Sequence, residues 1–496
     1  MKNYNLKLII CLLVTLVTVM SCETELDLTP VDEFAPENVL QSQAGLETLL
    51  FSSYLAYNMG QSVRDEILIN EVTTDVGYVR IGAVENEMRP FLNFNWDQST
   101  GQFASLFWTP RYRAIRDANT LLDNIEKSSA DEDFKKLMVA EARYIRAFEY
   151  AYMYKYFGVV PLRTSTDLVV QPKELGLPTE EEFLTFVETE FREAATDLLS
   201  PAQQNQTGRA TKGHAYGALT KFLMNTKQWG KVVDVTQELM DLNHYELFPN
   251  YRATFFIENE PQNNPNNKEI IITWSLTNEL GFNNDYQNGA FPPAFRTSSN
   301  IPEFAWTTSM ANWATQFSMR DGFVDSFDPN DDRKQTIIQN YFNASGVLVN
   351  LRTTPDNSRS LKYFDNNQIG NACGADTPYL RYADILLCRA EALNEINGPT
   401  QEAIDLVNLV RDRANVNTYV LGDVGSKDNF RDLILDERGW EFFSEGKRRE
   451  DLIRHGKFID MARARGLNAE AHEVYFPYPQ AEINANPALD QREGYN

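Results

Sequence analysis

The sequence predicts a mainly α-helical protein that carries a large loop-rich insert and a few short strands. Four long segments repeat apolar residues at three- and four-residue spacing, as amphipathic helices do: residues 111–125, 131–156, 179–199 and 211–225. Residues 250–375 are instead rich in Asn, Gly and Pro, as in QNNPNNKE and FNNDYQNGAFPPAF, which is typical of loops. Within them, the run EIIITWSL from Glu269 to Leu276 is the clearest candidate strand.

Two stretches predict the same supersecondary unit, a pair of helices joined by a short turn. They read GHAYGALTKFLMNTKQWGKVVDVTQELMD and LRYADILLCRAEALNEINGPTQEAIDLVNLVRDRA. In each pair, small residues on the first helix let the second approach closely: Ala215, Gly217 and Ala218, then Ala383, Ala390 and Ala392. This pattern resembles tetratricopeptide-type helix pairs, which stack into a superhelix, although no strict period runs through the chain. We expect a degenerate array of such pairs.

The chain begins with a short positive and apolar leader. Two lysines precede thirteen uncharged residues from Leu8 to Met20, too few to cross a hydrocarbon core of about 30 Å as a helix. A leader of this kind is typical of a secretory signal. Its end, Val-Met-Ser-Cys, resembles the bacterial lipobox, in which the cysteine becomes the first residue and carries lipid. We expect a lipoprotein signal over residues 1–21 and acylation of Cys22, with ordinary cleavage nearby as the alternative.

After the leader we expect a lipidated tether over residues 22–43 and one body over residues 44–496. The body divides into an N-terminal helical part (44–245), a loop-rich insert (246–376) and a C-terminal helical part (377–496). A chain of 496 residues is long for a single core, because cores stop growing near about 250–300 residues. The chain could therefore form two domains, or a helical array that grows by adding layers.

Net charge and cysteine content limit the partners and the disulfides that we expect. The formal net charge of −24 makes nucleic acid an unfavourable partner. With Cys11 in the leader and Cys22 acylated, only Cys373 and Cys388 remain. Export would permit a disulfide between them, but two unpaired thiols are the favoured reading.

Motifs for catalysis or metal binding are missing from the sequence. It contains no glycine-rich phosphate loop, no H-E-x-x-H and no G-x-S-x-G. The run DPNDDR starts like a calcium loop, but Arg333 and Gln339 stand where Gly and Glu are expected. We therefore expect no catalytic residue, no metal and no cofactor, while the many carboxylates leave a glycosidase pair conceivable.

The most ordered charged segment is LDERGWEFFSEGKRREDLIRHGKF. It predicts a helix to Glu445, a left-handed Gly446 after it, and a second helix from about Arg449. Eight charged residues crowd this corner: Glu437, Arg438, Glu441, Glu445, Arg448, Arg449, Asp451 and Arg454. We interpret them as Arg–carboxylate pairs that hold the two helices at a fixed angle, rather than as a catalytic site.

This corner also resembles a known family. DERGWEFFSEGKRREDLIRHGK is similar to the ER-x-x-E-x-x-x-EG-x-R-x-x-DL-x-R segment of the SusD/RagB family of outer-membrane lipoproteins. Four more stretches resemble segments of that family in the same order, from about residue 44 to 495: FWTPRYRAIRDANTLLDNI, EARYIRAFEYAYMYKYFGVVPL, YLRYADILLCRAEALNEING (with Asp384 in place of Glu) and FPYPQAEINANPALDQREGY.

The resemblance implies a tetratricopeptide-like scaffold with a loop-rich ligand face. It implies a non-catalytic protein anchored in the outer membrane and exposed at the cell surface, which captures glycans and passes them to a SusC-like TonB-dependent transporter. RagB-like members capture peptides instead, so peptide capture is the main alternative. A lipid-anchored glycoside hydrolase and a scaffold that binds only protein partners are further alternatives.

Aromatic rings in polar loops are the candidate ligand contacts, because a flat ring matches the apolar face of a sugar while amides and charged groups match its hydroxyl edge. Trp96 in NFNWDQSTGQ is the leading candidate, with Gln98 and Gln102 beside it. Further candidates lie in three other loops: Asp75, Tyr78 and Arg80, then Tyr286, then Trp306 and Trp313. Each ring could instead be packed in the core, and no family motif fixes these positions.

Overall fold

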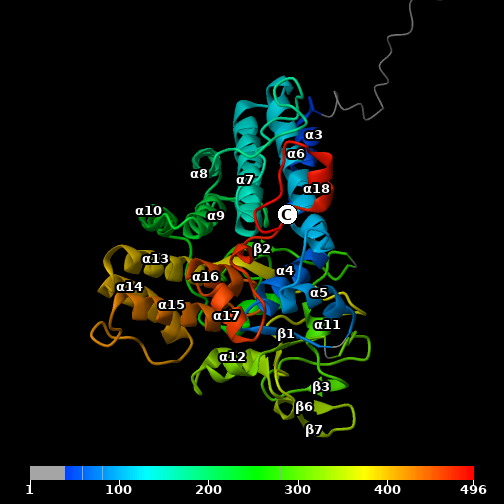
Figure 1. The fold of residues 1–496 in the computed structure, drawn as a ribbon, viewed down its shortest axis with the longest axis vertical. Coiled ribbons are helices and arrows are strands. Elements are labelled where there is room, and N and C mark those ends of the chain that lie inside the picture. Colours follow the sequence, from blue (N-terminus) through cyan, green and yellow to red (C-terminus); the bar gives the residue numbers. More distant parts are fainter. Residues whose placement is uncertain (1–39, 58–59, 81, 280, 315, 496) are drawn as a thin grey trace, which may run out of the picture.

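A computed structural model describes residues 40–495, apart from residues 58, 59, 81, 280 and 315. The predicted signal, Cys22 and most of the predicted tether lie outside the described residues. The described chain contains 16 α-helices and only short strands, which confirms the mainly helical prediction (Figure 1). None of the described helices is both long enough and apolar enough to cross a membrane.

The N-terminal part is a row of antiparallel helices in which each packs on its neighbour along the chain. They are α3 (Gln43–Tyr57), α6 (Thr109–Asn124), α7 (Glu132–Phe157), α8 (Glu180–Asp197), α9 (Lys212–Asn225) and α10 (Trp229–Met240). The four predicted ranges agree with α6, α7, α8 and α9 to within about two residues. Capping explains the sharp starts, since Thr179 and Glu182 form a reciprocal capping box at α8 and Asp131 caps α7.

The second predicted pair continues the array. Its helices are α13 (Tyr382–Asn397) and α14 (Gln401–Arg413), and α13 packs on α10. Gly217 shows why a small residue is needed where the first pair meets the sheet: a Cβ there would lie 2.5 Å from Leu380 Cδ2. The remaining C-terminal helices are α15 (Lys427–Phe442), α16 (Arg448–Arg454), α17 (Phe458–Ala464) and α18 (Gln480–Ala485).

The charged corner differs in detail from the prediction. Helix α15 ends at Phe442 rather than Glu445, because Ser444 already has a positive φ of 61°. Gly446 has a φ of 68°, as predicted for a residue that turns the chain between two helices. The second helix begins at Arg448, one residue from its predicted start.

Short elements fill the rest of the body. The N-terminal part also holds α4 (Gly60–Val72), β1 (Gly77–Val79), α5 (Ala83–Asn93) and a π-helical turn (Phe103–Trp108). Between the two helix pairs lie β2 (Ile270–Trp274), α11 (Tyr286–Ala290), β3 (Phe295–Thr297), β4 (Phe317–Met319), α12 (Asp321–Asp325), β5 (Ile337–Ile338), β6 (Asn340–Asn343), β7 (Leu348–Asn350), β8 (Arg359–Ser360) and β9 (Thr377–Arg381). The predicted strand over residues 269–276 is thus confirmed as β2.

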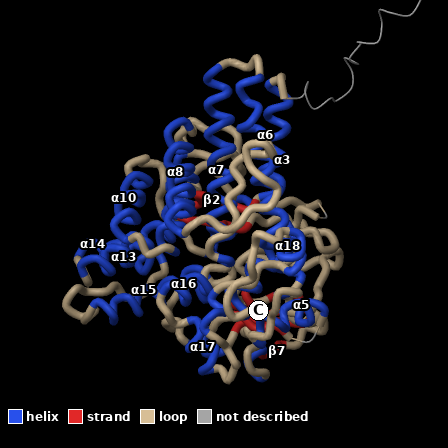
Figure 2. Tube along the Cα trace, turned by 45° about the horizontal axis from the view of Figure 1, so that its top comes forward, coloured by secondary structure: helices blue, strands red, loops and turns tan. Residues whose placement is uncertain are grey.

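The strands form small antiparallel sheets, β1–β4, β2–β9, β3–β6–β7 and β5–β8 (Figure 2). Two of them tie the loop-rich insert to the helical parts. In β2–β9, Thr273 pairs with Pro378 at the start of the C-terminal part. In β1–β4, Tyr78 pairs with Ser318, so the N-terminal loop after α4 is fixed to the insert.

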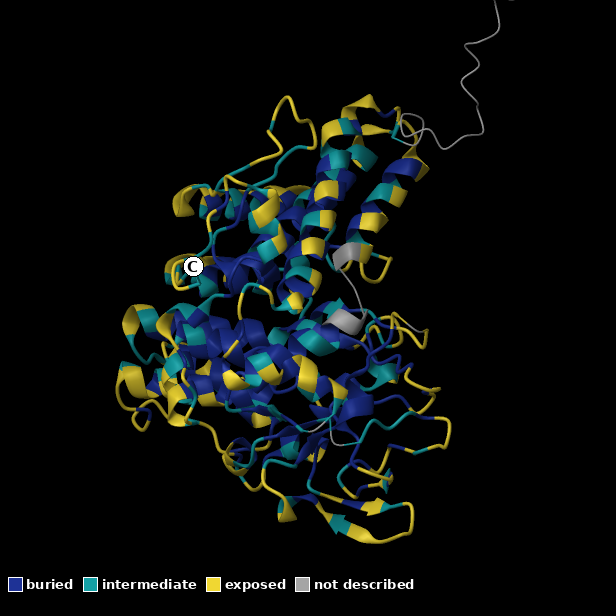
Figure 3. Cartoon of the chain, turned by 45° about the vertical axis from the view of Figure 1, so that its right-hand side comes forward, coloured by how far each residue is buried: buried dark blue, intermediate teal, exposed yellow. Residues whose placement is uncertain are grey.

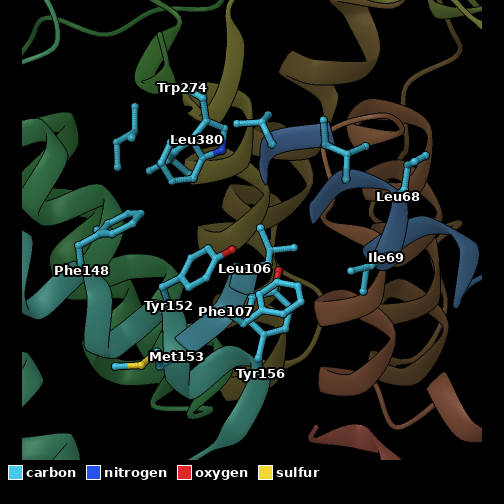
Figure 4. Packing of buried hydrophobic residues seen from close by; sticks show 14 of the residues in the cluster. Leu68, Ile69, Leu106, Phe107, Phe148, Tyr152, Met153, Tyr156, Trp274 and Leu380 are labelled. Carbon is cyan, nitrogen blue, oxygen red and sulfur yellow. The ribbon is translucent and has the colours of Figure 1, made fainter. Parts of the chain in front are cut away.

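One apolar core runs through the helical parts and the insert (Figure 3). At its centre, Phe148 of α7 packs on Trp274 of the β2–β9 sheet, and Tyr156 of α7 packs on Phe107 of the π-helical turn before α6 (Figure 4). A smaller cluster joins α13, α14 and α15. The division into three parts remains a sequence-based prediction. Cys373 and Cys388 are buried free thiols, as the favoured reading predicts.

Candidate functional site

The charged corner is a buried ion-pair network whose partners lie far away in the sequence. Within the corner, Arg438 of α15 reaches Asp451 of α16 at 2.9 Å, so this pair does join the two predicted helices. Most other partners are on different elements: Arg333 and Arg411 for Glu437, Arg333, Arg381 and Arg413 for Glu441, Arg381 and Lys362 for Glu445, Asp75 for Arg448, Glu391 for Arg454 and Asp384 for Arg438. The network therefore ties α15 to the insert, α13 and α14.

Two members of the corner show what the network does. Burial alone would raise the pKa of Glu441, but Arg413, Arg381 and Arg333 outweigh it and hold that pKa at about 2.

For Arg449 the predicted ion pair is wrong, because no carboxylate of the described chain pairs with it. Its guanidinium donates to the Val474 carbonyl at 3.0 Å and lies over the Phe476 ring. Glu441 and Arg449 are thus both held by contacts within the fold.

The leading candidate ring, Trp96, is placed in the core. Its exposure is 4%, and its ring packs against Phe91, Phe94 and Phe476. Its indole Nε1 donates to the Tyr495 hydroxyl at 2.9 Å. In this conformation neither face of the ring is open to a sugar, which does not fit the expected stacking role.

Tyr286 is placed in the core in the same way. It is 3% exposed, packs on Phe317 and Tyr363, and its hydroxyl shares a 2.8 Å hydrogen bond with Ser444. Its ring likewise offers no open face for stacking. Burial raises the pKa of its hydroxyl.

The candidates of the loop after α4 serve two different contacts. Asp75 forms a bidentate pair with Arg448, at 2.9 and 2.8 Å, so the structure joins a predicted ligand residue to the charged corner. Tyr78 lies in β1 beneath two guanidiniums, those of Arg80 and Arg320, at 5.5 and 5.3 Å from its ring centre.

Trp313 lies among polar side chains and remains partly exposed. Its backbone N–H donates to the Asn288 carbonyl, and its indole Nε1 donates to Asn371 Oδ1, both at 2.9 Å. The guanidinium of Arg64, from α4, lies 5.6 Å from the ring centre. We call Trp313, Arg64, Asp285, Asn288 and Asn371 the Trp313 cluster.

The backbone of the cluster is held rigidly by buried amides. The Asn371 carbonyl accepts from both Asn283 and Asn288, at 3.0 and 2.9 Å. Asn283 and Asn288 are buried, whereas Asn371 is exposed. An exposed amide supported by buried ones is well suited to hydrogen-bond a ligand, because its position is fixed before the ligand arrives.

Carboxylates surround the Arg64 guanidinium. It pairs with Asp65 at 2.6 Å and lies 3.5 Å from Glu87 and 3.9 Å from Asp285. Burial raises the pKa of Asp65 and of Asp285 more than Arg64 lowers them. The cluster thus joins one aromatic ring, one cation and several acceptors, drawn from α4, the start of α11 and two loops of the insert, with Glu87 of α5 beside it (Figure 1).

Of the remaining predicted ligand residues, Gln102 lies beside the Trp313 cluster, and Trp306 and Gln98 lie outside it. Gln102 donates to the Glu87 carbonyl at 3.3 Å, which places it beside the carboxylates around Arg64. Trp306 is half-buried against Phe291, outside the cluster. Gln98 lines a polar surface hollow of about 550 Å³ next to Trp96.

Sequence reasoning missed Arg64, Asp285, Asn288 and Asn371, although the run NNDYQNG contains two of them. Each is an ordinary polar residue in sequence, and only the tertiary fold brings α4 beside the insert loops. Among the described residues, no group of His, Cys, Asp or Glu side chains is arranged to hold a metal ion.

The fold is a scaffold of packed helix pairs with a loop-rich insert. Residues 257–495 match the model of the SusD family, and residues 26–224 match a model described as starch-binding and associating with the outer membrane. The chain belongs to the SusD family.

Named relatives and solved structures agree with that assignment. The chain is 26% identical to SusD-like protein P25 of Formosa agariphila over 96% of each chain. It is 24% identical to the starch-binding protein SusD of Bacteroides thetaiotaomicron, over 80% of this chain and 82% of that one. The fold is similar to a laminarin-binding SusD-like protein, with a TM-score of 0.74 and 21% identity over 91% of this chain and 99% of that one. It is also similar to surface glycan-binding protein A of Bacteroides thetaiotaomicron in complex with laminarihexaose, with a TM-score of 0.72 and 18% identity over 90% of this chain and 98% of that one.

Proposed function

We propose that the protein is a non-catalytic glycan-binding lipoprotein of the outer membrane. It captures an oligo- or polysaccharide at the cell surface and delivers it to a SusC-like TonB-dependent transporter. The observation that carries this proposal is the Trp313 cluster, a partly exposed indole beside a guanidinium and fixed amides, in a family whose named relatives bind starch or laminarin.

The cluster supplies what sugar binding needs. The open part of the Trp313 ring offers an apolar surface to the C–H face of a pyranose. Asn371 lies at the ring edge, the Arg64 guanidinium lies over the ring, and the exposed Glu87 carboxylate offers an acceptor beside it, so sugar hydroxyls can find both donors and acceptors.

Anchoring follows from the leader. A diacylated Cys22 would hold the protein firmly to a bilayer, because two acyl chains suffice where one is marginal. The polar residues up to about 43 would let the body move relative to the membrane and meet the transporter.

Isothermal titration of the protein against a panel of polysaccharides tests this proposal. We expect saturable binding of at least one glycan and no release of reducing ends during prolonged incubation. Binding of an extended peptide with no glycan bound would favour the RagB-like alternative, and steady release of products would favour a hydrolase.

A further inference from the structure

A second hollow is lined by residues of α12, α15 and α17, three helices that lie near one another in Figure 1. Its volume is about 440 Å³, and it shares no lining residue with that cluster. Trp440, Arg320 and Arg465 form the part that matters here, together with Arg448, Asp356 and Asp436. We call it the Trp440 hollow.

Trp440 gives the hollow an aromatic wall. The residue belongs to α15, is half-buried, and its indole Nε1 donates to Ser326 Oγ at 2.9 Å. Its ring also lines an adjoining hollow of about 210 Å³, which contains Asp328 and Arg411. A ring between two adjoining hollows is suited to an extended chain that crosses it.

The arginines of the hollow differ in how well they are satisfied. Arg448 is neutralised by its bidentate pair with Asp75. Arg320 donates to the Thr74 carbonyl at 3.2 Å, and the nearest carboxylate oxygen, on Asp356, is 4.0 Å away. Arg465 donates through Nη2 to the Thr73 carbonyl at 2.7 Å.

Arg465 also has donors that the described chain leaves unused. Its Nε and Nη1 are buried and find no hydrogen-bond acceptor among the described residues. Buried donors without an acceptor cost free energy, so native proteins rarely keep them unless a ligand, ion or water supplies the acceptor. Burial, and after it the neighbouring Arg320, lower the pKa of Arg465 to about 10. An anionic group between the two guanidiniums would supply the missing acceptor and would also offset the repulsion between Arg465 and Arg320.

We propose that the Trp440 hollow is a second saccharide-binding site that takes a sugar ring bearing a carboxylate or sulfate group. The ring lies on Trp440, its anionic group accepts from Arg465 and Arg320, and its hydroxyls donate to Asp356 and Asp436. This inference rests on the proposed glycan binding and adds a ligand class to it.

Titrations of matched probes test the inference. They use an oligogalacturonate hexamer for the carboxylate, a sulfated galactan hexasaccharide for the sulfate, a neutral β-glucan hexamer, and a hexa-aspartate peptide as a non-sugar anion. We expect at least one acidic saccharide to bind, with affinity that falls at least tenfold in Arg465→Gln and in Trp440→Ala and that weakens as salt rises. Arg463→Gln is the control, because Arg463 is an exposed arginine two residues away that lies outside the hollow.

A second measurement uses the unaltered protein, so it does not depend on how the variants fold. The ¹H–¹⁵N indole signal of Trp440, assigned by its loss in Trp440→Phe, should shift on addition of the bound acidic saccharide. The neutral hexamer should leave that signal in place.

The outcomes separate the two proposals. If glycans bind but no acidic saccharide depends on Trp440 and Arg465, the second site is wrong and the proposed function stands. If no saccharide binds at all, both fail. Equal response of Trp440 to neutral and acidic hexamers, or binding of the peptide alone, overturns the assigned ligand class.

Discussion

Asp75 and Arg448 form a bidentate ion pair although 373 residues separate them in the chain. The pair joins the loop that leads from α4 to β1 with the first residue of α16. Its side chains are 23% and 7% exposed, so water screens the pair only in part. Both residues line the Trp440 hollow, and Arg448 also belongs to the charged corner, so the pair connects the two.

Asp75→Asn tests that contact. Because the variant leaves the largely buried Arg448 without its charged partner, the free energy of unfolding should fall by about 1–3 kcal/mol at pH 7, measured by urea denaturation. The pKa of Asp75 is lowered, with Arg448 outweighing the effect of burial. The pair therefore stabilises the fold above the unfolded-state pKa of about 4, and its contribution is lost in acid.

The control for this pair is Asp460→Asn, which breaks an exposed pair with Arg463 at 3.8 Å. Exposed pairs contribute about 0–1 kcal/mol. Equal effects of the two variants would contradict the role given to Asp75.

Glu71 gives a pH-dependent prediction of opposite sign. It is 4% exposed in α4 and accepts from the Ser444 backbone N–H. Burial raises its pKa to about 8, against the lowering effects of backbone hydrogen bonds and Lys362. The folded protein should therefore lose stability as pH rises from about 4.5 to 8, because the carboxyl ionises in the unfolded chain while the buried one keeps its proton.

Glu71→Gln removes that loss while keeping a side-chain oxygen as acceptor. Relative to the unaltered protein, the variant should gain about 1–3 kcal/mol between pH 5 and pH 8, measured as free energies of unfolding. Glu132→Gln, at an exposed position, is the control. A stability difference that stays constant with pH would show that Glu71 is ionised throughout.

Trp96 should matter for stability rather than for ligand contact. Trp96→Ala leaves a cavity among Phe91, Phe94 and Phe476 and should cost about 3–5 kcal/mol. Trp96→Phe, which keeps an aromatic filling, should cost less. A normally stable Trp96→Ala protein with lost glycan affinity would instead restore the stacking role expected from the sequence.

The helical scaffold was predictable because its signals are local. The apolar period of residues 131–156 predicts a helix, and the glycine after α15 predicts a turn, from a few neighbouring residues alone. The roles of Trp96 and Arg333 were not predictable in this way. Trp96 is covered by Phe476 and bonded to Tyr495, and Arg333 pairs with Glu437, contacts that exist only after distant segments meet.

The candidate site shows the same limit. Trp313 could be selected from its loop as a possible stacking ring, but Arg64 could not, since α4 precedes it by more than two hundred residues. Family resemblance supplied the scaffold and the class of ligand. It did not supply the binding residues, because no motif fixes them.

Cys22 carries the anchoring prediction and lies outside the described residues. Cys22→Ala removes the thiol that would be acylated, so the protein should move from the membrane fraction to the soluble fraction after cell lysis. Ligand binding by the released protein should be unchanged. Retention at the membrane without acylation would mean that another contact, such as the transporter, holds the protein there.

The central claim, that the Trp313 cluster holds a glycan, is tested most directly by isothermal titration of Trp313→Ala with the glycan that the unaltered protein binds. Loss of a stacking ring should cost about 1–3 kcal/mol, by analogy with bases stacked on aromatic side chains, which is roughly a five- to 150-fold weaker Kd. Trp229→Ala, which removes another half-buried indole at the start of α10, should bind normally. An unchanged Kd for a folded Trp313→Ala protein would contradict the account.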